Sequence, residues 1–393
     1  MIISKEPKTF TFSTALSCSR CLKEYSVTQV NTYASCCNVP LLVEYDLSKQ
    51  FSRARLSGRA STMWRYSEML PVCSKENIVS LGEGMTPVFP VSKLGDKYGF
   101  SSLYMKDESV NPTGSFKARG LSVAVSKAKE FGIKQCIIPT AGNAGGAMAA
   151  YCAKAAIGCT VVMPVHTPEI FKQECELYGA ELILVDGLIN DCAGKVMELN
   201  SNNQYFDMST LKEPYRLEGK KTMGYEIAEQ FNWQLPDVII YPAGGGTGLI
   251  GIWKAFKEMI ALGWINGPLP KMIAVQSENC SPILHALKDP LNWKNNFVPK
   301  ATKANGLAVP YPFGMNMILN VLKESRGAAV SIGEDEIIAG VKEIAKNEGL
   351  IISPEGAATW RALLKLYKER KIGLQEKILL LNTGTGYKYL QNL

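Results

Sequence analysis

Histidine is almost absent from this chain, which has only His166 and His285 among its 393 residues. A Ser-His-Asp triad or a His-ligated metal centre would have to be built on one of these two, so we expect other groups to carry the chemistry. Blocks of like charge are also missing. The net charge is +7, but the basic residues are scattered, and the nearest approach to a basic tract is "GKKT" at Lys220 and Lys221. This pattern suits an anionic small molecule at least as well as nucleic acid, and we expect no nucleic-acid partner.

Signals for export or for a membrane are lacking too. The opening stretch "MIISKEPKTFTF" has no apolar core of the signal-peptide kind. The weakly charged segment 136–163 is interrupted by Pro139, Gly142 and Lys154, which is typical of a buried strand–helix–strand unit and not of a membrane span. The eleven cysteines are odd in number and mostly stand alone in apolar segments, as reduced thiols do. We therefore expect a cytoplasmic protein without a membrane partner.

Apolar residues make up 46% of the chain, and its length allows two domains of ordinary size. From about residue 100 onward, short β-branched runs alternate with helical patterns, as in "DVIIYPA" before "GLIGIWKAFKEMIALG". This alternation predicts an α/β fold with two doubly wound, mainly parallel-sheet domains. We assign residues 100–210 to a small α/β domain, and residues 61–99 together with 211–393 to a large one.

The first sixty residues differ from the rest and form an N-terminal segment that resembles a zinc ribbon. "CSRC" supplies Cys18 and Cys21, which is half of such a ribbon. The second half is incomplete, because Cys36 and Cys37 are adjacent and Ala34 stands where the missing ligand would be. We favour a degenerate ribbon or a plain hairpin without a metal; Cys18, Cys21 and Cys37 are the candidate ligands in the alternative.

One loop presents a lysine in an elaborate way. "SVNPTGSFKARG" makes a turn through Ser115 and then places Lys117 at the start of a predicted helix. A lysine that forms a Schiff base must be unprotonated part of the time, and this requires a desolvated and well-positioned site. The alternative is a solvated helix lysine without a function.

Three further loops follow predicted strands and carry groups that bind ligands. "PTAGNAGG" offers the amide of Asn143, and "LNTGTGYK" offers the hydroxyl of Thr383 or Thr385. "PAGGGTGLIG" has consecutive glycines before a helix, where free backbone N–H groups cradle phosphate. Ligands of parallel α/β folds bind at the carboxyl ends of strands, so we expect these loops to meet.

The same glycine loop permits a rival interpretation. Gly246, Gly248 and Gly251 spell G-x-G-x-x-G, and Glu278 closes the next predicted strand. These residues would suit a nicotinamide-dependent oxidoreductase. The rival reading leaves the Lys117 turn unexplained, whereas a phosphate cup, a lysine, an amide and a hydroxyl together are what pyridoxal phosphate needs.

Taken in order, the motifs resemble the threonine synthase group of the fold-type II (tryptophan synthase β-like) pyridoxal-phosphate enzymes. The resemblance covers nearly the whole chain. It is carried by the Cys-x-x-Cys start with "PLLVEYDL", and by "LGEGMTPVFPVSKLG", "NPTGSFKARG", "PTAGNAG", "YRLEGKKT", "PAGGGTG", "SPEGAA" and "NTGTGYK".

The resemblance implies a role for each matching residue. Lys117 would hold the cofactor covalently, Asn143 would form a hydrogen bond with the cofactor's phenolic oxygen, and Thr383 would face the cofactor's pyridine nitrogen. Arg216 would receive the phosphate of the substrate, and Ser115 would also contact the substrate. The cofactor's phosphate would be bound by Gly244, Gly245, Gly246, Thr247 and Gly248.

The implied reaction converts O-phosphohomoserine and water to threonine and phosphate by γ-elimination and β-addition, with Lys117 moving the protons. Four residues depart from the usual pattern of the group: Ala118, Ala144 where a hydroxyl residue is usual, and Thr210 and Leu211 where Asn-Ser is usual. These departures leave a lyase that eliminates or replaces at the β-carbon as an alternative. It would be a threonine/serine ammonia-lyase, or a cysteate-synthase-like enzyme acting on O-phosphoserine. A non-catalytic homologue is a third reading, and by analogy with the superfamily we expect a homodimer.

Overall fold

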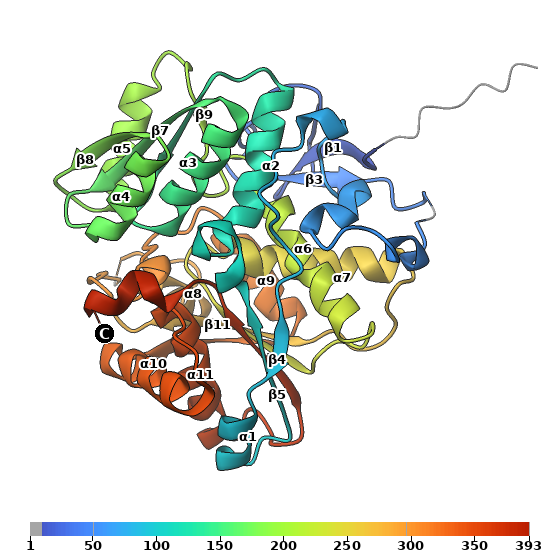
Figure 1. Cartoon of the computed structure of the whole chain (residues 1–393), viewed down its shortest axis with the longest axis vertical. Helices are drawn as coiled ribbons and strands as arrows, with labels where there is room; N and C mark the ends of the chain where they lie inside the picture. The colour runs from blue at the N-terminus through green and yellow to red at the C-terminus, as the bar shows by residue number, and fades with distance from the viewer. Residues whose placement is uncertain (1–9, 50, 296, 393) are drawn as a thin grey trace, which may run out of the picture.

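The computed structural model describes residues 10–49, 51–295 and 297–392, and it is an α/β structure with three sheets (Figure 1). The strands are β1 (Ser13–Cys18), β2 (Glu24–Tyr25), β3 (Leu41–Tyr45), β4 (Val88–Pro90), β5 (Ser102–Asp107), β6 (Gln135–Pro139), β7 (Gly158–Pro164), β8 (Glu181–Val185), β9 (Phe206–Asp207), β10 (Val238–Pro242), β11 (Lys271–Ser277), β12 (Ala328–Ile332) and β13 (Lys377–Asn382). The helices are α1 (Ser92–Tyr98), α2 (Lys117–Glu130), α3 (Asn143–Ala155), α4 (Glu169–Leu177), α5 (Ile189–Leu199), α6 (Tyr215–Gln230), α7 (Thr247–Ala261), α8 (Pro282–Lys288), α9 (Met315–Glu324), α10 (Glu334–Glu348) and α11 (Pro354–Lys368).

The large sheet has the order β12-β11-β10-β13-β5-β4 and is parallel except at its β4 edge. Its central strands are apolar on both faces, as expected for a sheet that helices cover on both sides. In β10, Ile240 belongs to the same buried cluster as Trp360 of α11, whereas its neighbour Ile239 belongs to the cluster on the other face, with Ile252 of α7 and Ile318 of α9. The expected doubly wound architecture is confirmed.

The small sheet has the order β8-β7-β6-β9 and is parallel throughout. The same alternation covers it on both faces. Ile138 of β6 packs against α2 and α3, and its neighbour Ile137 packs with Val196 of α5. In Figure 1 this sheet lies above the large one, with α2 beside it.

One expected boundary needs correction. The sequence pattern predicts that the small domain starts at residue 100, but β5 pairs with β13 along its whole length, from Ser102 opposite Lys377 to Asp107 opposite Asn382. This strand therefore belongs to the large sheet, and only the segment after it enters the small unit. The pairing partner lies about 270 residues away, so local sequence pattern could not reveal it. The remaining domain limits stay predictions.

The N-terminal segment forms an antiparallel sheet, β2-β1-β3, as the ribbon-like pattern predicts. Leu16 of β1 and Val43 of β3 share a buried cluster with Leu121 of α2. At the end of β3, Tyr45 donates a hydrogen bond to Glu218 of α6 at 2.8 Å. The sheet is thus fixed to the two helices that carry the lysine and the arginine of the predicted site.

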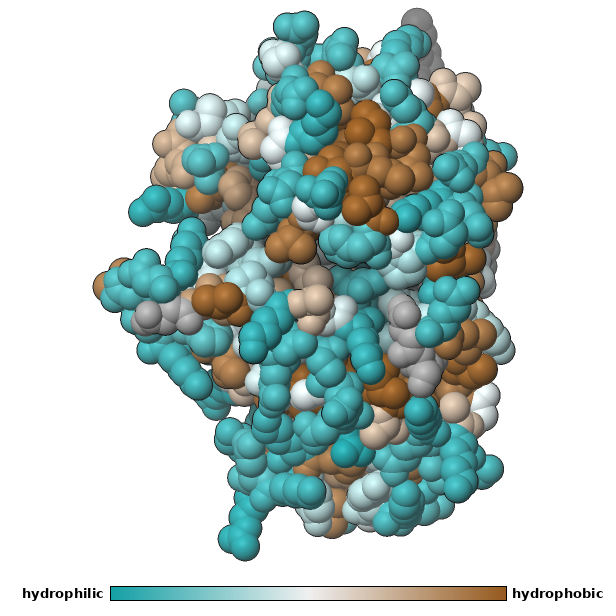
Figure 2. All heavy atoms as spheres, turned by 90° about the vertical axis from the view of Figure 1, so that its left-hand side faces the viewer, coloured by the Kyte–Doolittle hydropathy of each residue, from teal (hydrophilic) through white to brown (hydrophobic). Residues whose placement is uncertain are grey.

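Exposed apolar side chains gather over the β8 edge of the small sheet (Figure 2). They come from α4, β8, α5 and the adjoining turns, and include Leu177, Leu184, Leu188 and Met197. Within the described part of the chain, every helix is too short or too polar to cross a lipid bilayer.

Candidate active site

The carboxyl ends of β5, β10 and β13 in the large sheet and of β6 in the small sheet lead into one cavity. This cavity is partly open to solvent. Lys117, Asn143, Thr383, Arg216 and the loop from Gly244 to Thr247 all line it. The loops predicted from the sequence therefore meet at one place.

The turn before Lys117 is built to fix that lysine at the cavity. Thr113 and Gly114 have φ angles of 62° and 66°, a region that glycine adopts readily. A Cβ at Gly114 would lie 2.8 Å from Cγ2 of Thr385, so a side chain has no room. The backbone of the turn is tied to the loop after β13, because Thr385 N donates to Gly114 O at 2.8 Å and Phe116 N donates to Thr383 O at 3.0 Å. The start of α2 is thus held against the end of the large sheet.

Lys117 is electrostatically prepared to lose its proton. Burial, together with the positive charge of Arg216, lowers its pKa to about 8 from 10.5, and Glu355 only partly opposes this. At pH 7 about one tenth of such a lysine is neutral, compared with about one part in 3,000 at the ordinary value. The ammonium also lies 5.0 Å from the centre of the Phe116 ring. The amine is therefore available for covalent chemistry near neutral pH.

The glycine loop follows β10 and opens α7. Gly246 has a φ of 75°, and the helix begins at the next residue, Thr247. A Cβ at Gly244 would lie 2.3 Å from the carbonyl oxygen of Gly306, and one at Gly245 would lie 2.8 Å from Cγ2 of Thr210. Only glycine fits these places, and a helix N-terminus with free N–H groups attracts phosphate.

Two more buried cations come from α6. Lys220, fully buried, donates from Nζ to Thr247 Oγ1 at 3.3 Å, beneath the glycine loop. Burial, with Lys117 and Arg216 nearby, lowers its pKa well below the ordinary value. Arg216 is 1% exposed. Its Nη1 donates to Met208 O, but its Nε has no partner among the described residues.

Carboxylates lie near this group of basic side chains, but none forms a hydrogen bond with Arg216 Nε. The nearest acidic oxygen to Arg216 Nε belongs to Glu213 and is 3.9 Å away, which is too far for a hydrogen bond. Burial raises the pKa of Glu213 to about 7, although Arg216 lowers it. A buried guanidinium that lacks hydrogen bonds is costly, so an anionic ligand in the cavity would stabilise Arg216. The glycine cradle and the lysine fit pyridoxal phosphate.

Asn143 at the start of α3 is oriented by the C-terminal segment. Its Nδ2 donates to the Tyr389 hydroxyl at 3.3 Å, and its Oδ1 accepts from Lys388 Nζ at 3.1 Å. Lys388 is held in turn by Glu174 at 2.7 Å. An amide nitrogen carries two N–H groups, so the second can donate into the cavity.

Two predicted residues do not line the cavity, and their roles stay predictions. Ser115 is fully buried, and its hydroxyl accepts from Lys117 N at 3.4 Å. Gly248 packs against Tyr241, since a Cβ there would lie 2.0 Å from the Tyr241 hydroxyl oxygen. Conversely, Glu355, within the motif "SPEGAA", lines the cavity, and the sequence predicts no role for it. Nothing in the pattern "GKKT" shows that Lys220 is buried.

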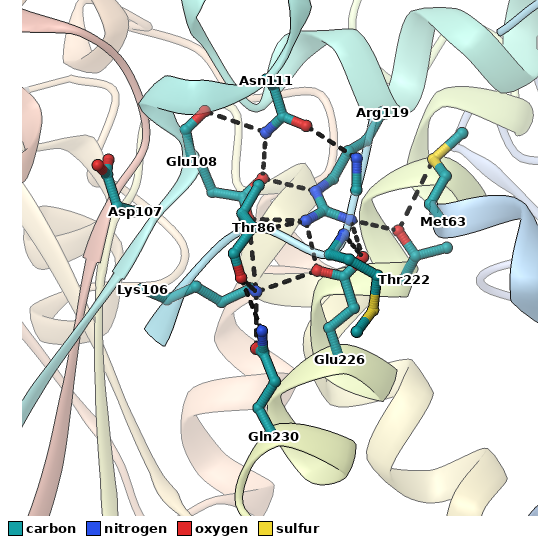
Figure 3. A network of polar contacts seen from close by, with 12 residues as sticks. Met63, Thr86, Lys106, Asp107, Glu108, Asn111, Arg119, Thr222, Glu226 and Gln230 are labelled. Carbon is teal, nitrogen blue, oxygen red and sulfur yellow. Dashed lines mark hydrogen bonds and ion pairs between the residues drawn. The ribbon is translucent and has the colours of Figure 1, made fainter. Parts of the chain in front are cut away.

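Local sequence patterns also do not reveal an ion network around Arg119, two residues after Lys117 on α2 (Figure 3). Arg119 on α2 donates from Nε to Glu108 at 2.5 Å and from Nη1 to Glu226 of α6 at 2.6 Å. Lys106 of β5 reaches Glu226 at 3.0 Å. All four side chains are fully buried, and their formal charges cancel. Because the network joins β5, α2 and α6, it fixes the helix start that presents Lys117.

The candidate metal ligands of the N-terminal segment lie elsewhere. Cys18, Cys21 and Cys37 do not line the Lys117 cavity. They gather with Cys36 in a separate group at the ends of the ribbon strands.

A family model described as "Pyridoxal-phosphate dependent enzyme" matches residues 79–384, which is more than half of the chain. The chain belongs to this family. Its cofactor is therefore pyridoxal phosphate, and the nicotinamide alternative is not supported. Gly251 of the rival fingerprint serves helix packing instead, since a Cβ there would lie 2.9 Å from Lys221 N of α6.

Comparison with individual proteins shows which pyridoxal-phosphate enzymes this chain resembles. It is 35% identical to a threonine synthase of Methanocaldococcus jannaschii, over 94% of this chain and 92% of the relative. It is 34% identical to a threonine synthase of Methanosarcina acetivorans, over 94% and 91% of the two chains. Among solved structures, maize serine racemase matches with a TM-score of 0.65 and 19% identity, over 78% of this chain and 93% of that one. The last likeness confirms the fold-type II architecture.

Proposed function

We propose that this enzyme converts O-phosphohomoserine and water to threonine and inorganic phosphate, as a carbon–oxygen lyase. The observation that carries the proposal is Arg216. It is a buried guanidinium that lines the Lys117 cavity, and its Nε has no hydrogen-bond partner among the described residues. A cavity with one phosphate cradle and one further cation suits a phosphorylated cofactor together with a phosphorylated substrate. The threonine synthases that are 34% and 35% identical to this chain support the same reading.

Each residue of the cavity has a definable task in this reaction. Bound pyridoxal phosphate withdraws electrons from the carbons next to the substrate nitrogen and so acidifies their hydrogens. Lys117, with a pKa of about 8, can accept such a proton at Nζ and return it on another carbon. Arg216 can orient the departing phosphate, because a planar guanidinium binds its oxygens in pairs. Asn143 follows a strand of the small sheet and Thr383 follows a strand of the large sheet, so the two can hold the bound cofactor in position from different sides.

The second candidate is a lyase that eliminates or replaces at the β-carbon, and two positions favour it. Ala144 places a methyl group where the related synthases usually have a hydroxyl. Leu211 is 2% exposed, has a φ of 62° and points toward Gly314, so it offers no polar group to a substrate. Its neighbour Thr210 does line the cavity. This alternative predicts threonine or serine as the substrate, or O-phosphoserine, which is one carbon shorter than O-phosphohomoserine.

A product assay distinguishes the two candidates. The cofactor-loaded enzyme is offered O-phosphohomoserine, O-phosphoserine and threonine in parallel, and threonine, phosphate and 2-oxo acid are measured. We expect threonine and phosphate in equal amounts from O-phosphohomoserine alone, and no product with Lys117→Ala. Oxo acid from threonine, or turnover of O-phosphoserine only, would replace the proposal with the alternative.

A matched pair of variants tests the role of Arg216. Arg216→Lys keeps the charge but loses the planar pair of donors, whereas Arg216→Gln loses the charge as well. We expect KM for the phosphorylated substrate to rise in both, more in Arg216→Gln, while the cofactor remains bound. Unchanged KM in both would remove Arg216 from substrate binding.

We also propose that the enzyme works as a cytoplasmic homodimer. All eleven cysteines are free, which supports a reducing compartment. The exposed apolar side chains over the β8 edge supply a surface that a second copy could cover (Figure 2). Light scattering of the purified protein tests the dimer, and a monomer at micromolar concentration would contradict it.

A further inference from the structure

The ribbon contains two turns with the same backbone structure. In the first, Cys18 N donates to Lys23 O at 2.9 Å and Leu22 N donates to Cys18 O at 3.0 Å. In the second, Ala34 N donates to Val39 O at 2.9 Å and Asn38 N donates to Ala34 O at 2.8 Å. The first bond joins residues five apart in the chain in both turns, and the second joins residues four apart in both. Leu22 and Asn38, which occupy the same place, both have positive φ angles, of 61° and 51°.

This repeat shows which residues correspond. Cys21 corresponds to Cys37, and Cys18 corresponds to Ala34, which has no sulfur. The missing thiol is nevertheless present, because Cys36 brings its Sγ to 3.4 Å from that of Cys21. The ligand atoms of Cys18, Cys21, Cys36 and Cys37 all lie within 4.8 Å of one another. The expectation of an incomplete ribbon overlooked this, because Cys36 occupies the second position of its turn and not the first.

We propose that these four cysteines bind one Zn²⁺ ion, with Cys36 as the ligand that replaces the one lost at Ala34. Zinc bound by four thiolates has Zn–S bonds of about 2.3 Å, and a tetrahedron with such bonds places its sulfurs about 3.8 Å apart. The spacing of the four cysteines matches this size. A disulfide would need sulfurs at about 2.05 Å, and two of the four thiols, those of Cys21 and Cys36, are exposed to an incoming ion.

The site is structural and not catalytic. Protein sulfur fills all four positions, which leaves none open for water or a substrate. The turns also have something to support. Tyr33, just before the second turn, packs edge-on against Phe313 at 5.8 Å. Shortly beyond Phe313, Ile318 of α9 lies against Gly246 of the glycine loop, where a Cβ would be 2.4 Å from Ile318 Cδ1. Zinc would therefore stiffen the turns that contact the segment behind the cofactor's phosphate cradle.

The test starts with the metal content of the full-length, cofactor-loaded protein, purified under reducing conditions without chelators. Elemental analysis should find one zinc per chain. Zinc affinity is then measured by competition with a chromogenic chelator. Cys36→Ser and Cys37→Ser should each weaken it by at least about tenfold, because each removes a thiolate. Cys73→Ser is the matched control, since Cys73 is exposed but lies outside the cluster, and it should change nothing.

A rescue variant tests the assignment of Cys36 in particular. The double substitution Ala34→Cys/Cys36→Ser rebuilds a regular Cys-x-x-Cys pair and should restore the affinity lost in Cys36→Ser. If the single variants do not fold, Co²⁺ titration of the wild-type protein still counts the ligands, because sulfur-to-cobalt absorption grows with the number of thiolates.

Three results would overturn the proposal: no zinc bound even after Zn²⁺ is added, a Cys21–Cys36 disulfide in the native protein by mass spectrometry, or unchanged affinity in Cys36→Ser.

Discussion

The titration of Lys117 follows most directly from the structure. With a pKa of about 8, its neutral fraction at pH 7 is roughly 300 times that of a lysine at the ordinary value of 10.5. Its neutral fraction should rise nearly tenfold between pH 6 and pH 7, and should level off above pH 8 to 9. Because folding lowers the pKa of Lys117, burying its protonated form costs stability. This cost is present in full below about pH 8 and is gone above the ordinary value of 10.5.

Competitive acetylation of the cofactor-free protein measures this fraction, because only the neutral amine reacts. Brief pulses of acetic anhydride at several pH values, followed by mass spectrometry of the Lys117 peptide, give a rate profile. The exposed Lys323 serves as an internal reference, so that the acetylation rate of Lys117 can be corrected for the amount of acetic anhydride present. The midpoint of the profile does not depend on how well the reagent reaches the cavity. We expect a midpoint near pH 8.

Two variants predict opposite movements of that midpoint. Arg216→Gln removes a positive neighbour and should raise the pKa of Lys117, whereas Glu355→Gln removes a negative one and should lower it. A wild-type midpoint near 10.5, or the same direction of change in both variants, would refute the electrostatic account of this cavity.

Further predictions concern the network, the glycine loop and acid stability. Arg119→Met leaves Glu108 and Glu226 as buried carboxylates without their main partner, and should lower the free energy of unfolding by about 3–5 kcal/mol in denaturant titrations; a loss below 1 kcal/mol would argue against the network. Burial raises the pKa of Glu226, but Arg119 and Lys106 outweigh this effect and lower the pKa to about 2. The contribution of Glu226 to stability is therefore complete above the ordinary carboxyl pKa and is lost as the pH falls toward 2. Unfolding measured from pH 6 to pH 3 should show this acid-side loss in the wild type and a smaller one in Arg119→Met. Gly244→Ala should weaken cofactor binding by at least about tenfold, because its Cβ meets the Gly306 carbonyl; Gly194→Ala in α5, where a Cβ meets nothing within 4 Å, should leave cofactor titrations unchanged.

Local patterns predicted the parts of the molecule that depend on neighbouring residues. Strand–helix alternation gave both parallel sheets, since apolar runs such as "ILLL" in β13 have to be buried on both faces. The lysine turn and the glycine loop were also predictable, because each needs residues with special backbone freedom at a strand end. These are properties of a few consecutive residues, and they survive any arrangement of the rest of the chain.

What the sequence concealed depends on contacts between distant segments. Lys220 and Lys221 are adjacent, yet one reaches Thr247 below the glycine loop and the other pairs with Glu218 and Glu258 under the ribbon. Helix geometry turns consecutive side chains by about 100°, so only the packing of α6 between two partners explains why both are buried. Similarly, the sequence does not show that Cys36 places its Sγ beside that of Cys21, because this depends on how the two turns of the ribbon lie relative to one another.

We expect Lys117, and not its buried neighbour Lys220, to hold the cofactor. Reduction of the cofactor-loaded enzyme with borohydride, followed by proteolysis and mass spectrometry, fixes the cofactor to the lysine that carries it. We predict the phosphopyridoxyl group on the peptide containing Lys117, with none on the peptide containing Lys220. The group on Lys220, or on no lysine of the cavity, would contradict the account.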